Sequence, residues 1–116
     1  MTEPTKNNAI HGFLHWRPWQ VHEHVVDRVV MGARLFPLQG YPFLLEVSVE
    51  YALGPGGLTV TTTATNPGEH ALPYGCGQHS YLSPGGEGLI DDCTLRLGAA
   101  PGLDQVSAAR ALEPSP

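Results

Sequence analysis

The part of this sequence best suited to acid–base chemistry is a glycine-rich stretch around His79. Gly75 and Gly77 precede this histidine and allow the backbone to approach a ligand closely, because glycine has no Cβ atom. Tyr81 returns to the same side as His79 if the stretch is extended, since strand side chains repeat every two residues. Imidazole also exchanges protons near neutral pH. The pattern predicts that His79 and Tyr81 face one pocket; the alternative is a hydrogen-bonded histidine at a strand end, without a chemical role.

A second segment with chemical potential, residues 7–19, has no helical periodicity and is predicted to be a loop. It carries Trp16 and Trp19 together with His11, His15 and an arginine. The C–H face of a pyranose packs on an aromatic ring, while its hydroxyl groups seek imidazole or charged partners. The two tryptophans therefore predict either a sugar-stacking surface or a plug at the open end of a β-sandwich.

Length and charge limit the classes of protein to which the chain can belong. Its 116 residues are enough for one small domain. A net charge of -5 with six scattered Lys and Arg residues argues against nucleic acid or an anionic membrane as partner. We find no membrane-spanning run and no signal peptide, so a cytoplasmic location is predicted. Cys76 and Cys93 lack any paired metal spacing and are predicted to be reduced.

The clearest structural pattern is a β-hairpin in the middle of the chain. Apolar and polar residues alternate through residues 45–53, which predicts a strand with one face toward the core and one toward water. Residues 58–65 continue the pattern, with Leu58, Val60 and Ala64 on one side. The sequence Gly-Pro-Gly-Gly between them predicts a four-residue hairpin loop. With 14 Gly and 11 Pro in all, the composition favours many short strands joined by turns, an all-β fold.

Other elements are predicted from weaker patterns. Residues 20–31 are rich in Val and His and predict a single strand. His22 and His24 lie two apart on it and predict a solvated face. Residues 89–97 predict one more strand. Residues 102–113 have helical spacing but end before Pro-Ser-Pro, which predicts either a short helix or a loose tail.

Three short segments follow one another in a recognisable order. They are Asn8-Ala9-Ile10-His11-Gly12, Gly40-Tyr41-Pro42-Phe43 and Gly77-Gln78-His79-Ser80-Tyr81-Leu82. Together with the hairpin, they resemble the aldose 1-epimerase, or galactose mutarotase, family. No single segment is specific, but their order and separation over residues 8–97 make a chance match improbable.

This resemblance implies a large antiparallel β-sandwich whose concave face binds a hexose. Enzymes of the family interconvert the α and β anomers of an aldose without a metal or organic cofactor. A carboxylate takes the proton from the C1 hydroxyl while a histidine protonates the ring oxygen, so that the ring opens, rotates and closes again. By this resemblance His79 is the proton donor, His11 binds the sugar and Tyr81 lines the pocket.

Departures from the family pattern are as informative as the matches. The family's glutamate base and its sugar-binding aspartate follow the His-x-Tyr segment, and its binding arginine precedes the first motif; none has a counterpart among these residues. We therefore expect residues 1–98 to be a partial mutarotase-like domain and residues 99–116 to be a divergent tail, disordered or forming a short helix. Such a fragment is expected to have impaired activity alone, and either to self-associate through exposed strand edges or to be poorly stable by itself.

Two other functions fit the same residues. One is a sugar-binding module without catalysis, since the resemblance supplies no general base. The other is a metal site built from His11, His15, His22 and His24, which are close in sequence but have no set ligand spacing.

Overall fold

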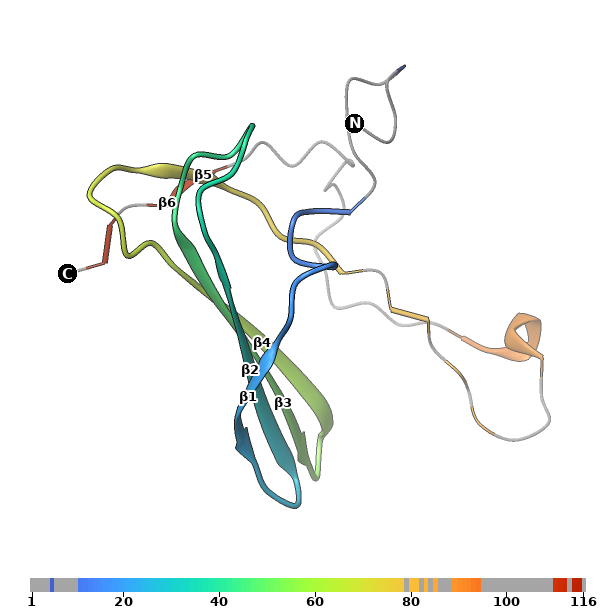
Figure 1. The fold of residues 1–116 in the computed structure, drawn as a ribbon. Helices are drawn as coiled ribbons and strands as arrows, with labels where there is room; N and C mark the ends of the chain where they lie inside the picture. Colours follow the sequence, from blue (N-terminus) through green and yellow to red (C-terminus); the bar gives the residue numbers. More distant parts are fainter. Residues whose placement is uncertain are drawn as a thin grey trace. The chain divides into compact units, whose positions relative to one another are not determined.

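The computed structural model describes residues 5, 11–78, 80, 81, 83, 85, 89–94, 110–112, 114 and 115 (Figure 1). The chain divides into two compact units, one of residues 1–72 and 111–116 and the other of residues 73–110. In the part of the chain that the structure describes, no helix is long and apolar enough to cross a membrane.

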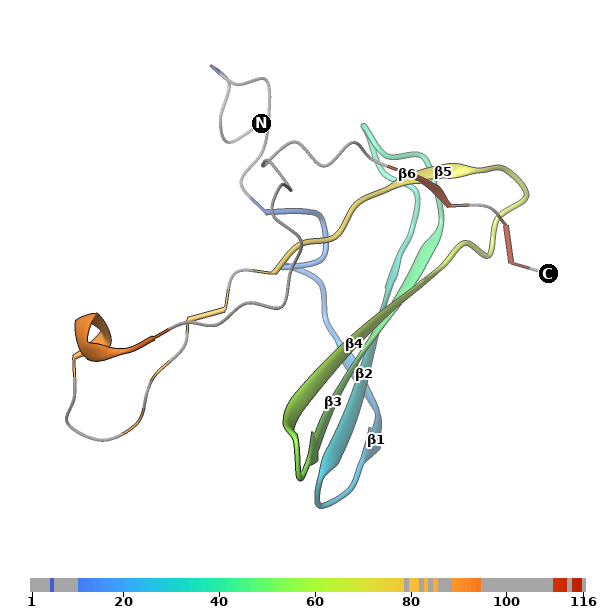
Figure 2. The ribbon, with the colours of Figure 1, turned by 180° about the vertical axis from the view of Figure 1, so that it is seen from behind.

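A four-stranded antiparallel sheet forms the first unit (Figures 1 and 2). Its strands are β1 (Gln20–His24), β2 (Arg28–Leu35), β3 (Leu45–Gly54) and β4 (Gly57–Thr65), and their order in the sheet follows their order in the chain. Each strand is thus joined to the next by a hairpin or a short connection. The predicted all-β antiparallel class is confirmed.

The predicted hairpin between β3 and β4 is present, but its loop is shorter than expected. Gly54 already pairs with Gly57, so the loop has two residues rather than four. Pro55 suits the first loop position because its ring fixes φ near the value that a turn requires. Gly57 has a φ of 104°, in the left-handed region that glycine adopts without strain. The two outer glycines therefore belong to the strands.

The segment predicted as one strand, residues 20–31, is two strands. β1 ends at His24 and β2 begins at Arg28, and the Val25 N–H donates to the Arg28 carbonyl across the turn (2.8 Å). Val26 at the turn is 100% exposed. The prediction was wrong because valine favours strands and Asp27 alone in this turn is a typical turn residue.

The core lies on one face of the sheet, toward the end of β3 at which Leu45 stands. Leu35 is 1% exposed and pairs with the buried Leu45, while Val47 and Val49 continue the buried row along β3. The row was predicted to stay buried up to residue 53. Its far end is exposed instead, because no described residues cover the large apolar side chains there, namely Tyr51, Leu53, Leu58 and Val60.

A buried asparagine fixes the turn that follows β4. Asn66 is 2% exposed; its Nδ2 donates to the His70 carbonyl (3.0 Å) and its Oδ1 accepts from the Gly68 N–H (3.0 Å). Its carbonyl accepts from the Ser115 N–H (2.8 Å), and Asn66 forms a parallel bridge with Pro114. The Asn66 side chain thus supplies hydrogen-bond partners to two backbone groups of the turn, which lie outside the strands.

Short elements follow the main sheet. β5 (Leu72–Tyr74) and β6 (Arg110–Leu112) form a two-stranded sheet, and η2 (Ile90–Asp92) is one turn of 3-10 helix. The strand predicted for residues 89–97 is therefore wrong at residues 90–92, where two successive aspartates in the first turn favour a helical start. Of the predicted helix or tail, residues 110–112 are a strand and residues 102–109 lie outside the described residues. The boundary at residue 98 stays a prediction.

The Asn66→Ala substitution should destabilise the first unit. It removes both side-chain hydrogen bonds of a buried group and leaves the Gly68 N–H and the His70 carbonyl without that partner. We expect a loss of about 1–3 kcal/mol in the free energy of unfolding, measured by urea denaturation. Thr63→Ala, an exposed change on β4, is the control and should cost less than about 0.5 kcal/mol. Equal losses for the two variants would contradict the role of Asn66.

Candidate functional site

His11 begins the described part of the loop before β1 in an unusual backbone conformation. Its φ is 65°, the left-handed region that residues with a Cβ atom seldom adopt. The residue is exposed, and its imidazole ring centroid lies 5.2 Å from that of His15. Backbone strain of this kind persists only where the surroundings hold it, and it is often found at binding sites.

His15 lies next to an exposed tryptophan in the same loop. Its Nδ1 lies 2.8 Å from the Gly12 carbonyl oxygen, which can only accept, so Nδ1 carries the proton and the other ring nitrogen is the acceptor in the neutral imidazole. Its ring centroid is 4.7 Å from the ring of Trp16, which is 85% exposed. His11, His15 and Trp16 thus form a continuous row of rings, which we call the loop ring cluster.

Aromatic packing and a hydrogen bond hold the loop in place. The Phe13 ring centroid lies 5.4 Å from that of Tyr41, which in turn meets Phe43 edge to face at 5.1 Å. The Trp19 indole N–H donates to the Leu14 carbonyl (3.3 Å) from a half-buried position. Burial raises the pKa of the Tyr41 hydroxyl above its ordinary value. Trp19 therefore helps to fix the loop, whereas the exposed Trp16 is not a buried plug.

The loop ring cluster can do what a sugar site requires. An exposed indole offers a flat apolar surface for the C–H face of a pyranose, and imidazole nitrogens offer both a donor and an acceptor to hydroxyl groups. Trp16 is too exposed to be a buried plug, and sugar stacking on this loop stays a prediction.

The other predicted site residues are placed as follows. His79, the predicted proton donor, lies outside the described residues. Tyr81 is described, and its side chain is 95% exposed. It belongs to the second unit, whereas His11 belongs to the first. Joint contact of His11, His79 and Tyr81 with one sugar stays a prediction.

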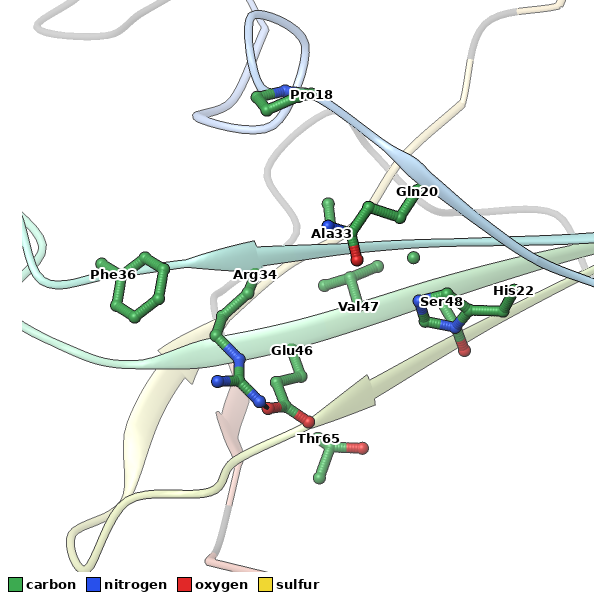
Figure 3. Close-up of a pocket in the computed structure, with 11 residues that line it drawn as sticks. Pro18, Gln20, His22, Ala33, Arg34, Phe36, Glu46, Val47, Ser48 and Thr65 are labelled. Atoms are coloured by element: carbon green, nitrogen blue, oxygen red, sulfur yellow. Dashed lines mark hydrogen bonds and ion pairs between the residues drawn. The ribbon is translucent and has the colours of Figure 1, made fainter.

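All four strands of the main sheet contribute to a cavity of about 690 Å³ (Figure 3). It is lined by Pro18, Gln20, His22, Gly32, Ala33, Arg34, Phe36, Glu46, Val47, Ser48 and Thr65. Most of these positions alternate with the buried row of β3 and its neighbours, so they occupy the polar face of the sheet.

Charges in this cavity are paired with each other. Arg34 forms an ion pair with Glu46, its partner across the β2–β3 register, and its guanidinium carbon lies 6.0 Å from the Phe36 ring centroid. Figure 3 shows the two charged groups meeting along one wall. Because Arg34 and Glu46 satisfy each other, this wall suits a neutral polar ligand better than an ion.

His22 reaches the polar face through a local irregularity and a close approach. The β1–β2 register shifts between Val21 and Glu23, which lets His22 lie over Gly32. A Cβ atom at position 32 would stand 2.8 Å from Nε2 of His22, so the ring occupies space that only glycine leaves open. An isolated glycine inside a strand pattern was the signal for this approach in the sequence. Pairing of Arg34 with Glu46 had no local signal, because it depends on strand register.

Among the described residues, no group of three or more His, Cys, Asp or Glu side chains could hold a metal ion. The rings of His11 and His15 lie close together in the loop, whereas His22 lies on the sheet and His24 ends β1. The alternative of a four-histidine metal site gains no support from this arrangement. Cys76 and Cys93 are exposed free thiols.

Comparison with known proteins identifies the family. A family model described as aldose 1-epimerase matches residues 2–112. The chain therefore belongs to the aldose 1-epimerase family, and the predicted membership is confirmed.

A curated relative shows how much of the family's length is present. The chain is 43% identical over 84 residues to "Uncharacterized protein YihR" of Escherichia coli (strain K12). This similarity covers 72% of the chain but 27% of the relative, so the chain spans about a quarter of the protein that it matches. No solved structure matches the chain significantly.

Ionisation of Tyr41 provides a test of how the loop is packed. Because burial raises its pKa above 10.0, the folded protein keeps this proton at a pH where the unfolded chain loses it. Stability should therefore fall as the pH rises through 10.0 toward the folded pKa. Absorbance at alkaline pH, recorded as the difference between the protein and its Tyr41→Phe variant, should show one tyrosine that titrates late. A Tyr41 transition at the ordinary tyrosine pKa would contradict the packing of Phe13 and Phe43 on this ring.

Proposed function

We propose that this chain binds an aldohexose as the sugar-holding part of an aldose 1-epimerase site. The observation that carries the proposal is the family match over residues 2–112 combined with the exposed loop ring cluster at the first family-like segment. In this proposal His11 binds sugar hydroxyl groups, Trp16 supports the sugar ring, and Tyr81 lines the pocket.

The chemistry that we propose follows the family. His79 donates a proton to the ring oxygen as the C1–O bond breaks, while a base removes the proton of the C1 hydroxyl and a carbonyl forms at C1. Rotation about C1–C2 and reclosure, with both protons returned, give the other anomer. No metal or organic cofactor takes part. We expect the protein to act in the cytoplasm.

The family's general base, a glutamate that follows the His-x-Tyr segment, has no counterpart that we recognise in this sequence. Paired acid and base catalysis needs both groups at once, because protonation of the ring oxygen opens the ring only if the C1 hydroxyl proton is removed in the same process. We therefore propose that this chain alone holds the sugar and accelerates its mutarotation little. A sugar-binding module without catalysis is the second candidate. Both candidates bind the sugar, and they differ in whether a base supplied from outside this chain would restore mutarotation.

Loss of sugar affinity in the Trp16→Ala variant is the first test. We expect calorimetric titration with galactose to show binding about twofold to tenfold weaker, because one stacked aromatic ring contributes about 0.5–1.5 kcal/mol. Phe36→Ala is the matched control, an exposed aromatic residue that lines the sheet cavity instead. Weaker binding in Phe36→Ala but not in Trp16→Ala would place the sugar in that cavity and contradict the proposal.

Polarimetry tests the catalytic part. Freshly dissolved α-galactose or α-glucose should change its optical rotation at the rate seen in protein-free buffer, because the predicted His79 acts without a positioned base. Enzyme-like acceleration that His79→Ala abolishes would show that the chain supplies its own base and would overturn this part of the proposal.

A further inference from the structure

The two outer edges of the main sheet are built very differently. β1 has five residues, carries Glu23 and has a register shift in its pairing with β2. Short length, charge and a bulge are the devices by which proteins prevent a sheet edge from pairing with another chain. β4 has nine residues, no charged side chain and no proline. Among the described residues, no strand pairs with its outer edge.

Backbone hydrogen bonds reveal which groups of β4 point outward. The Leu53 N–H donates to the Asp27 carbonyl (2.8 Å), away from β4, so Leu53 and Leu58 do not exchange hydrogen bonds. Since bonded and non-bonded pairs alternate along an antiparallel ladder, the residues of β4 with outward N–H and C=O groups are Leu58, Val60, Thr62 and Ala64. Asn66 continues this set, and its carbonyl is indeed taken by Ser115 on the outer side.

We propose that β4 is a self-association edge, which pairs antiparallel with β4 of a second copy so that Thr61 stands opposite Thr61. This register pairs residue 58 with 64 and residue 60 with 62, and so uses every outward group of β4 without the Asn66 carbonyl that Ser115 occupies. Shifting this pairing by two residues in either direction leaves the outward groups of residue 58 or 64 unpaired, or requires the outward groups of Asn66 as partners.

Side chains favour the same pairing. No charge meets a like charge, because residues 57–65 carry none, although the whole chain has a net charge of -5. On the apolar face the exposed Leu58 of each copy would lie beside Ala64 of the other, and the opposite face would continue a row of threonines. A two-fold axis through Thr61 closes the pair, so the product is a dimer rather than an open chain of subunits.

Disulfide trapping tests the register. In the Cys76→Ser, Cys93→Ser background, Thr61→Cys should form a covalent dimer under mild oxidation, because non-bonded antiparallel pairs place the Cα atoms about 4.5 Å apart. Thr59→Cys, on the same strand face, is the matched control; its two copies would be separated by about 13 Å, beyond disulfide reach. Absent or equal cross-linking of the two variants would overturn the proposal.

Sedimentation of the full chain without engineered cysteines tests the association itself. We expect a concentration-dependent dimer, weakened about tenfold or more by Thr62→Pro, which removes an outward donor and spares the β3–β4 ladder. Thr61→Lys should weaken it about fivefold by placing like charges opposite each other, while its ammonium can meet Glu50 in the same chain and preserve the fold. A monomer at all concentrations, or a dimer that both variants leave unchanged, would overturn the proposal. Neither outcome depends on sugar binding.

Discussion

Cross-strand register among β2, β3 and β4 is the constraint on which the first unit depends. Leu35 faces Leu45, and Ala33 faces Val47, so apolar side chains meet on one side of the sheet while Arg34 and Glu46 meet on the other. A slip of one residue would exchange the two faces, burying the ion pair and exposing the core. The short glycine-ended hairpin loop fixes this register where β3 turns into β4.

Two surfaces of the first unit are open to a ligand, namely the loop before β1 and the polar face of the sheet. The loop before β1 is anchored by Phe13 against Tyr41, and this leaves His11, His15 and Trp16 exposed beside a sheet that needs none of them for its core. The polar face forms a second concave surface, but the family-like segment that carries His11 lies in the loop and contributes nothing to this face. We therefore propose the loop, and not the cavity, as the sugar-binding surface.

How much the sequence could predict depended on whether a feature was local. The β3–β4 hairpin was predictable because strict alternation and a Gly-Pro-Gly-Gly turn lie within one short segment. The turn at Val26 was not, since valine promotes strands and its exposure is set by the pairing of β1 with β2. Family-like segments pointed to His11, yet its left-handed backbone and its contact with His15 arise from the folded loop. His79 remains a prediction from resemblance.

We propose that an aldose contacts this chain at the loop ring cluster and at the stretch around His79. Amide and imidazole NMR spectra of the labelled protein, recorded with and without galactose, test it most directly. We expect shifts concentrated at residues 11–16 and 79–81, with little change along β2 and β3. Shifts confined to the cavity residues of the polar face, or none at saturating sugar, would contradict it.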